Sequence, residues 1–299
     1  MTEGSLQKRP SHAKLYSLIG LMILLWSLNF VIAKVALREF PPLLLSGLRT
    51  TLAALFILPV YAWKRRTDRD MWTREDVPML VLLGIFGVAL NQVFFVAGLS
   101  RTSVGHSALM IGVTPMIVLL IAALAGQERI TWKKALGMAV AIGGVAVLNL
   151  SPSKSAGATI GGDILILLSC VTFALFTVLG KGVSKRHSSI TVNTFAYSGG
   201  AIALFPVTFI YVRSFHLAGL SAAAWLALVY MAAFPSVLCY LIYYYALTHI
   251  PASRASAFSY IQPLLAMLLA VPLLGEHITS ALALGGTFIL AGVFLTERG

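Results

Sequence analysis

The sequence predicts an all-α membrane protein with ten transmembrane helices, arranged as two inverted repeats of five helices, with both termini in the cytoplasm. Three observations predict this fold class. Of the 299 residues, 59% are hydrophobic and 11% are charged, whereas about 25% of a typical soluble domain is charged. The apolar residues form runs of about twenty, the length of helix that crosses a bilayer. Stretches of the first half also recur in the second half.

The apolar runs indicate helices rather than the strands of a barrel. Backbone groups in lipid must pair within the protein, which leaves α-helices and closed barrels as possible spans. Barrel strands would show as alternating segments of about ten residues, and these runs are longer and do not alternate. Ten spans are expected, at residues 15–33, 43–63, 77–98, 102–125, 132–150, 161–181, 190–212, 222–247, 252–274 and 278–296.

These spans divide the chain into four parts. Residues 1–14 are expected to form a cytoplasmic tail, and residues 15–150 the first five-helix repeat. The Ser/Gly-rich residues 151–160 are the expected linker, and residues 161–296 the second, inverted repeat. The first apolar run is too long for a signal-peptide core and has no small-residue cleavage site after it, so we expect it to be retained.

The basic residues predict the orientation in the membrane. With the N-terminus in the cytoplasm, 15 of the 22 Lys and Arg residues fall in cytoplasmic segments and 4 in outer segments. Because basic loops stay on the cytoplasmic side, we expect a multi-pass protein of the cell inner (cytoplasmic) membrane. The formal charge of +12 is spread over loops between spans, which argues against a nucleic-acid partner. The lipid bilayer is the expected surrounding, and a monomer suffices.

The clearest repeat joins residues 102–131 to residues 250–279, 148 positions later. Pro115 then aligns with Pro263, and Glu128 with Glu276. Because each half has an odd number of spans, the second copy enters the membrane upside down. Inverted repeats are typical of transporters, since two similar halves can form inward-open and outward-open states of similar energy.

Pro115 and Pro263 are expected inside helices, where a proline removes one backbone hydrogen bond and bends the helix. In a membrane the freed carbonyl needs a partner or a polar cavity. We expect the pair to act as hinges or gates. Two kinks that are simply packed by neighbouring helices would leave the same pattern.

Five charged residues at or inside the spans are expected to have structural or gating roles: Lys34, Arg49, Glu128, Lys181 and Glu276. Glu128 and Glu276 each come just before the next span, which favours capping of its free amides over a gating salt bridge. Lys34 can extend to the membrane interface. An arginine as deep as Arg49 costs about 2.5–3.5 kcal/mol on insertion scales, which predicts a structural tether or a contact with cargo.

Polar and aromatic side chains on the first, third, fourth, sixth, eighth and ninth spans predict a cavity between the halves. Its lining is uncharged and amphipathic, which suits flat or zwitterionic small molecules. The consecutive tyrosines 243–245 fit an aromatic belt at the membrane interface equally well. The residues expected to line the cavity are Trp26, Asn29, Asn91, Gln92, Phe95, His106, Met110, Phe173, Phe176, Tyr240, Tyr244, Ser256, Tyr260 and Gln262.

No catalytic, cofactor or metal site is predicted. The ten acidic residues fall in tails, loops or span ends, so no carboxylate is expected at mid-membrane to relay protons or hold sodium. His106 is the one titrating group expected along the path. Cys170 and Cys239 each lie in a span and have no disulfide or metal-binding spacing. The absence of mid-membrane carboxylates from the expected spans favours facilitated export down a gradient, or exchange, over transport coupled through a carboxylate relay.

Short motifs occur in a fixed order along both halves. They are Trp26-Ser-Leu-Asn-Phe30 with Lys34, Pro42 with Arg49 and Ala53, Ser107 to Pro115 with Glu128, Gly137 with Gly143 and Gly144, and then Pro263, Glu276, Gly285 and Gly292. This ordered set resembles the drug/metabolite transporter superfamily in its EamA-type ten-helix exporters, and is most similar to the bacterial amino-acid exporter branch.

The resemblance implies ten helices with both ends inside and a central cavity bounded by spans 1, 3, 4, 6, 8 and 9, with help from spans 2 and 7. Spans 5 and 10, which carry small-residue glycine faces, would lie at the rear. Two departures matter. Ser27 stands where the family usually has glycine, and Ala196 leaves Arg49 without a counterpart in the second half.

The leading hypothesis is an inner-membrane transporter that exports amino acids, aromatic ones included, or similar small amphipathic metabolites by alternating access. A broad drug or toxic-cation transporter, or a nucleotide-sugar-like metabolite transporter of the same fold, is the alternative. An intramembrane lipid-modifying enzyme would need a clustered nucleophile, metal ligands or paired carboxylates, which the spans lack. A receptor or channel fits an inverted repeat less well.

Overall fold

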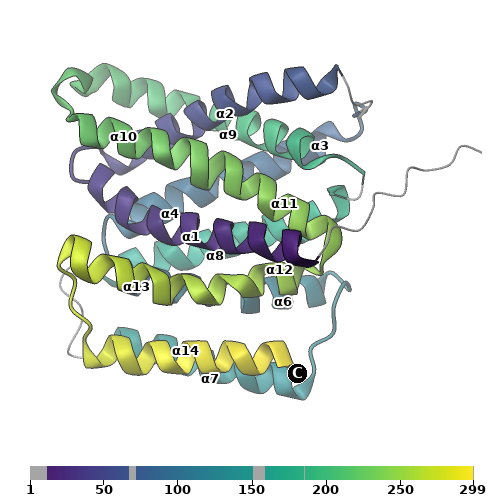
Figure 1. Ribbon diagram of the computed structural model, residues 1–299, viewed down its shortest axis with the longest axis vertical. Coiled ribbons are helices and arrows are strands. Elements are labelled where there is room, and N and C mark those ends of the chain that lie inside the picture. Colours follow the sequence, from purple (N-terminus) through teal and green to yellow (C-terminus); the bar gives the residue numbers. More distant parts are fainter. Residues whose placement is uncertain (1–11, 67–71, 151–158, 185, 299) are drawn as a thin grey trace, which may run out of the picture.

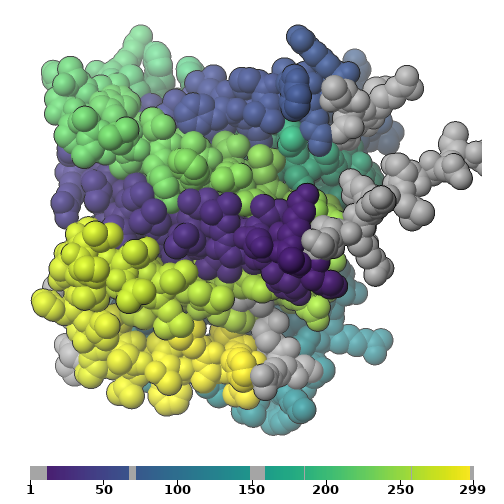
Figure 2. All heavy atoms as spheres, viewed as in Figure 1, coloured from purple at the N-terminus to yellow at the C-terminus, as the bar shows by residue number. Residues whose placement is uncertain are grey.

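The protein is described here by a computed structural model, which covers residues 12–66, 72–150, 159–184 and 186–298. Within these ranges the regular elements are all helices, which form one bundle (Figure 1). On the face shown in Figure 2, the N-terminal helix (purple) lies between green and yellow helices of the second half of the chain. Residues 12–14 of the expected tail and residues 159–160 of the expected linker are described, and the rest of both segments lies outside these ranges.

The helices follow one another in two similar series. The first series is α1 (His12–Ala36), α2 (Pro42–Arg65), α3 (Val77–Leu83), η1 (Gly84–Leu90), α4 (Asn91–Leu99), α5 (Val104–Ile111), α6 (Thr114–Leu124) and α7 (Trp132–Leu150). The second series is α8 (Ile160–Val183), α9 (Ser189–Ser214), η2 (Leu217–Gly219), α10 (Ala222–Met231), η3 (Ala232–Leu238), α11 (Cys239–His249), α12 (Ala252–Ala257), η4 (Phe258–Tyr260), α13 (Ile261–Leu274) and α14 (Ser280–Arg298).

Eight helical stretches of the described chain are long and apolar enough to cross a membrane. They coincide with eight of the ten expected spans. The other two expected spans are also helical, as α7 and α14. These two helices pack against each other along one edge of the bundle, and α2 packs against α9 at the opposite edge (Figure 1). The helix α1 begins, and α14 ends, at the same end of the bundle.

A π-helical segment interrupts the same span in each series. The segments η1 (Gly84–Leu90) and η3 (Ala232–Leu238) lie 148 residues apart. Side chains bond to the same backbone position in both, because Tyr240 Oη donates to the Gly87 carbonyl at 3.3 Å and Trp26 Nε1 donates to the Pro235 carbonyl at 3.1 Å. Single π-helical turns often mark functional sites, and these two join the halves beside the cavity described below.

The expected hinge prolines do not lie in the middle of helices. The chain breaks at Gly112 and Val113, so Pro115 stands in the first turn of α6. Pro263 likewise stands in the first turn of α13, directly after the 3₁₀ turn η4. Amides of a first turn have no acceptor within the helix, so a proline there removes no helical hydrogen bond. The prolines therefore begin new helices after a break, and neither lies in a helix interior, where both were expected.

The crossing of α7 and α14 depends on glycine, as expected for small-residue faces. A Cβ atom at Gly144 would lie 2.6 Å from the carbonyl oxygen of Gly285, and one at Gly137 would lie 2.4 Å from that of Gly292. The two backbones are thus in contact at two points. Gly143, in contrast, has no atom within 4 Å of a Cβ and is exposed.

This difference predicts opposite effects of alanine at two adjacent positions. Gly144→Ala should destabilise the folded protein by about 1–3 kcal/mol, because its methyl group must push two backbones apart. Gly143→Ala should be neutral or slightly stabilising, because alanine is the better helix former. Unfolding midpoints in detergent would measure both. Equal midpoints for the two variants would contradict the close packing of these helices.

Candidate functional site

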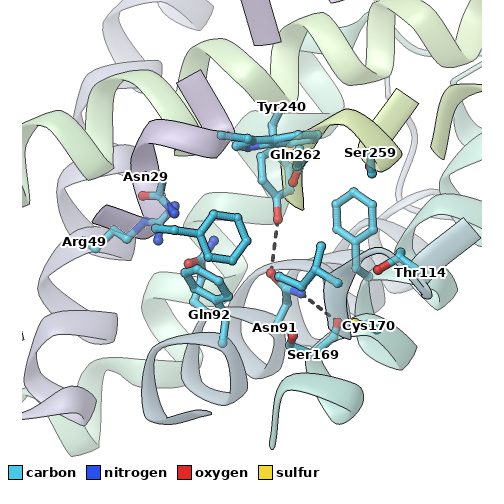
Figure 3. A pocket seen from close by; sticks show the side chains of 15 residues that line it. Asn29, Arg49, Asn91, Gln92, Thr114, Ser169, Cys170, Tyr240, Ser259 and Gln262 are labelled. Carbon is cyan, nitrogen blue, oxygen red and sulfur yellow. Dashed lines mark hydrogen bonds between the residues drawn. The ribbon is translucent and has the colours of Figure 1, made fainter. Parts of the chain in front are cut away.

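A cavity lies between the two series of helices, and 15 side chains line it (Figure 3). Its volume is about 90 Å³, counted as the space open to the centre of a water molecule. Counted in the same way, a single water needs about 10–15 Å³. The cavity can therefore hold several waters. Its lining residues are Trp26, Asn29, Phe30, Arg49, Asn91, Gln92, Phe95, Ile111, Thr114, Ser169, Cys170, Phe173, Tyr240, Ser259 and Gln262.

The two series contribute to the cavity through matching positions. Four pairs of lining residues are related by the repeat, with an offset of 147 or 148 residues. These pairs are Trp26 with Phe173, Gln92 with Tyr240, Ile111 with Ser259, and Thr114 with Gln262. The last two pairs flank the breaks between α5 and α6 and between α12 and α13. Both broken helices thus bring their interruption to the wall of one cavity.

An aromatic wall forms one part of the cavity. The Trp26 ring meets Phe173 and Tyr240 edge-on, with both centroid separations at 6.0 Å. The Tyr243 ring lies behind them, 5.1 Å from Phe173. Edge-to-face contacts of this kind favour one arrangement of the rings. The wall presents flat apolar surface to the cavity, and the Trp26 and Tyr240 donors are occupied by the π-helical carbonyls.

A polar chain crosses the cavity. Tyr240 Oη lies 3.3 Å from Asn91 Oδ1 as well as from the Gly87 carbonyl, and its single proton can be donated to either acceptor. Asn91 Nδ2 donates to the Ser169 carbonyl at 2.9 Å, and dashed lines in Figure 3 mark both contacts of Asn91. Other polar atoms of the lining are buried and lack a hydrogen-bond partner in the described structure: Asn29 Oδ1, Gln92 Oε1 and Arg49 Nη1. Buried polar atoms are rarely left unpaired, so waters or polar groups of a ligand can meet these atoms in the cavity.

Arg49 contacts both the protein and the cavity. Its Nε donates to Ser236 Oγ at 2.8 Å, which ties α2 to the π-helical segment η3. The side chain lines the cavity and its residue is 2% exposed. Sequence analysis left a structural tether and a cargo contact open as alternatives, and the structure places Arg49 where it can be both.

Eight of the fourteen residues expected to line the cavity do so: Trp26, Asn29, Asn91, Gln92, Phe95, Phe173, Tyr240 and Gln262. The structure places the other six elsewhere. Phe176 and Tyr244 are fully buried behind the aromatic wall, with ring centroids 5.0 Å apart. Met110 is buried in the apolar core, Ser256 Oγ donates to the Ser253 carbonyl, and Tyr260 packs on the core.

Tyr243 and Tyr244 are also fully buried, so the alternative of an interfacial aromatic belt is wrong for both. Tyr243 Oη pairs with Thr177 Oγ1 at 2.9 Å. A helix that packs on several sides buries polar and aromatic residues both at the cavity and behind it. Residue type alone does not show which of these two positions a residue occupies.

His106 lies outside the cavity and is paired with an acid. Its Nδ1 is 2.8 Å from Asp163 Oδ1, which also accepts a hydrogen bond from Thr102 Oγ1 at 3.2 Å. Both partners are buried. The prediction that His106 lines the path was therefore wrong. Asp163 does lie at a span end, in the first turn of α8, but its burial against α5 was not foreseen.

Six lining residues were missed: Phe30, Ile111, Thr114, Ser169, Cys170 and Ser259. Some could have been found. Thr114 is the repeat equivalent of Gln262, and each precedes the matched proline of its half. Ser169 and Cys170 precede Phe173 by four and three residues, so they share its helical face. Ile111 and Ser259 have no chemistry in common, and their role follows from position alone.

The two repeated glutamates cap helices of the opposite series. Glu276 accepts from the Val104 and Gly105 amides at 2.6 and 3.0 Å, at the start of α5. Glu128 Oε1 accepts from the Ser253 amide at 3.4 Å, at the start of α12. Capping was the favoured prediction, but the capped helices differ from those expected.

The following helices, α7 and α14, are capped by threonines instead. Thr131 Oγ1 accepts from the Lys134 amide at 3.3 Å, and Thr279 Oγ1 accepts from the Leu282 amide at 3.2 Å. Glu128 and Glu276 point toward helices of the opposite series because the chain turns sharply just before each of them. Gly126 and Gly275, with φ of 69° and 68°, end α6 and α13 in the left-handed region that favours glycine.

The lysines of the repeat lie at helix ends. Lys181 Nζ donates to the Leu247 and Ile250 carbonyls at the end of α11, the second at 2.6 Å. A cation is stabilised there by the helix dipole. Lys34, its equivalent at the end of α1, is half-buried and interacts electrostatically with Glu276.

Polar links outside the spans join the series at both ends of the bundle. Asp76 lies 3.2 Å from Arg186 and 3.3 Å from His187. Hydrogen bonds from the backbone and side chain of Thr73 and from His187 lower the pKa of Asp76 to about 2. At the other end, hydrogen bonds from the Ser221 hydroxyl and amide lower the pKa of Glu39.

The reciprocal caps give a prediction for stability. Glu276→Ala leaves two amides of α5 without an acceptor and should destabilise the protein by about 1–2 kcal/mol. Glu276→Gln keeps one acceptor and should cost less. Unfolding midpoints in detergent would measure both, with the exposed Glu75→Ala as the control. If the Glu276→Ala and Glu75→Ala midpoints coincide, Glu276 does not hold the start of α5.

Apolar spanning helices around a cavity of polar and aromatic side chains, with matching contributions from two halves, define a membrane transporter. The sequence places it further: the chain belongs to the EamA-like transporter family, which matches residues 14–150 and again residues 160–298. The two matches correspond to the two series of helices. Membership of this family makes the protein a transporter rather than an enzyme.

Relatives match nearly the whole chain. An uncharacterized transporter of Archaeoglobus fulgidus is 31% identical, over 95% of this chain and 99% of its own. The "Probable terminal-alkyne amino-acid exporter" of Streptantibioticus cattleyicolor is 28% identical, over 93% and 91%. The "Probable amino-acid metabolite efflux pump" of Salmonella typhimurium is 26% identical, over 93% of each. A solved crystal structure has the same fold, with a TM-score of 0.69 at 19% identity over 96% of this chain and 98% of its own.

Proposed function

We propose that the protein exports amino acids, aromatic ones included, or similar small amphipathic metabolites from the cytoplasm by alternating access. The four repeat-related pairs that line the cavity carry this proposal, because matching positions of both halves would then contribute to one small-molecule site. Polar groups and an aromatic wall in one small cavity suit an amphipathic cargo. Two relatives carry the names of an amino-acid exporter and an amino-acid metabolite efflux pump.

The proposal includes the membrane topology. Ten spans would form two inverted five-helix repeats, residues 15–150 and 161–296, in the cell inner membrane with both termini in the cytoplasm. The start of α1 and the end of α14 at one end of the bundle support it. So do the basic residues that follow α2, α6 and α8, which alternation of the helices places at that same end.

Transport would proceed by motion of the halves about the cavity. The breaks in the fourth and ninth spans are the points where bending needs no helical hydrogen bond to be lost, and both reach the cavity wall. Pro115 and Pro263 prevent each helix from closing across its break, because they supply no amide to the first turn. In this way the pair serves as hinges.

The transport activity is tested with the purified protein in liposomes. Counterflow of labelled phenylalanine, followed by competition from other amino acids, should be saturable. Ser259→Trp fills the cavity and should abolish counterflow, whereas Leu268→Trp, which places the same side chain at a residue 70% exposed, should not. A nonsaturable flux would indicate a channel. Equal activity of the two tryptophan variants would show that cargo does not pass through this cavity.

The hinge role is tested separately. Pro115→Ala and Pro263→Ala restore an amide that lets the helix extend across its break, so the maximal counterflow rate should fall several-fold while membrane insertion is unchanged. Pro272→Ala, at an exposed position inside α13, is the matched control and should retain the rate. Equal rates for all three variants at equal expression would rule out the hinges.

A further inference from the structure

The cavity contains a positive charge that the protein does not neutralise. Arg49 Nε is bonded to Ser236, but Arg49 Nη1 is buried and has no hydrogen-bond partner in the described structure. A guanidinium does not lose its proton in a protein. The charge is therefore permanent, and a buried permanent charge is destabilising unless a counter-charge meets it.

No acidic side chain of the described residues forms an ion pair with Arg49, and none lines the cavity. The polar groups near Arg49 include Ser236 and the side chains of Tyr197, Tyr230, Cys239 and Tyr240, from η3, α9, α10 and α11. These are hydroxyl and thiol groups without a formal charge at neutral pH. Within the described part of the chain, the missing counter-charge does not come from the protein.

The repeat offers a comparison, because the other half has no arginine at the equivalent position. In the other half the equivalent residue is Ala196, which is fully buried. There the backbones of α9 and η1 meet directly, since a Cβ atom at Gly84 would lie 2.8 Å from the Ala196 carbonyl oxygen. The equivalent crossing of α2 and η3 carries Arg49 instead. The crossing of α9 and η1 thus packs tightly without a charged residue, whereas the crossing of α2 and η3 contains Arg49, which lines the cavity.

From these observations we propose that Arg49 binds the carboxylate of the cargo; this rests on the proposed transport function and narrows its substrate class. A guanidinium donates two parallel hydrogen bonds to a carboxylate, and Nη1 is the free donor. The unpaired amide oxygens Asn29 Oδ1 and Gln92 Oε1 line the same cavity and accept hydrogen bonds from the cargo ammonium group. Figure 3 shows Asn29, Arg49 and Gln92 toward one side of the cavity.

The arrangement selects for α-amino acids by charge. The carboxylate cancels the Arg49 charge, and the aromatic wall of Trp26, Phe173 and Tyr240 receives the cargo side chain. A cation without a carboxylate meets Arg49 with like charge and is excluded. This separates the protein from a transporter of toxic cations with the same fold, whose cavity would need a negative group.

Competition in liposomes tests the assignment with three compounds of nearly the same shape. Phenylalanine and 3-phenylpropanoate both carry a carboxylate and should inhibit phenylalanine counterflow. Phenethylamine lacks the carboxylate and should not inhibit. Arg49→Gln should raise the half-saturating phenylalanine concentration about 30-fold or more, as expected for loss of one partner of a buried charge pair. Arg49→Lys keeps the charge but cannot donate two parallel hydrogen bonds, so its half-saturating concentration should lie between those of the unsubstituted protein and Arg49→Gln.

Two controls separate binding from structure. Arg213→Gln removes an exposed arginine that lies over the Phe209 ring and should leave transport unchanged. The unfolding midpoint of Arg49→Gln without ligand should equal or exceed that of the unsubstituted protein, because a buried charge has been removed. A lowered midpoint, matched by Ser236→Ala, with unchanged phenylalanine affinity would make Arg49 a tether only and would overturn the proposal.

Ligand-induced stabilisation in detergent makes this test independent of transport. Millimolar phenylalanine or 3-phenylpropanoate should raise the unfolding midpoint of the unsubstituted protein but not of Arg49→Gln, and phenethylamine should raise neither. If no amino acid is transported but the carboxylates still stabilise through Arg49, the proposed export fails and the carboxylate site stands. If phenylalanine is transported equally by Arg49→Gln, or is displaced by phenethylamine, export stands and the carboxylate site is refuted.

Discussion

The fold depends on one constraint: each helix end in a membrane protein leaves backbone groups without a partner in the helix, and the protein must supply partners where water does not. Two spans are interrupted here, between α5 and α6 and between α12 and α13. The amides at the start of α5 receive Glu276, and the start of α12 receives Glu128. Each half therefore completes a helix of the other. The two spans that are interrupted at the cavity are therefore also the two whose first amides are paired by the opposite half.

The π-helical segments meet the constraint in a second way. Each widens a turn of its span, and the carbonyl at the same position of each accepts a hydrogen bond from a cavity aromatic, Tyr240 at Gly87 and Trp26 at Pro235. The aromatic wall is thereby held by backbone atoms of both halves. Its rings keep their place because their polar atoms are used within the protein, which leaves their apolar faces for the cavity. Against this paired background Arg49 stands out, since its counterpart is an alanine.

Much of the fold was predictable from the sequence, because the lipid around a membrane protein allows few backbone structures. In lipid an apolar run of about twenty residues has few structures available to it other than a helix, and the helices found coincide with the expected runs. The repeat also predicted which residues would share a role, as with Glu128 and Glu276. It did not show what they would contact. Both were expected to cap the helix that follows in the chain, and both cap a helix more than 100 residues away.

The sequence by itself determined the class of the molecule: apolar helices, two matched halves and a set of polar residues too numerous to be buried without purpose. The tertiary structure decided which of those residues meet. Asn29 and His106 are both polar residues in apolar helices, yet one lines the cavity and the other is paired with Asp163 outside it. Helical periodicity gives the face of a residue, but in a bundle every face meets another helix. The rotation and tilt of each neighbour decide whether that face meets a cavity or a core, and these follow from contacts between distant segments.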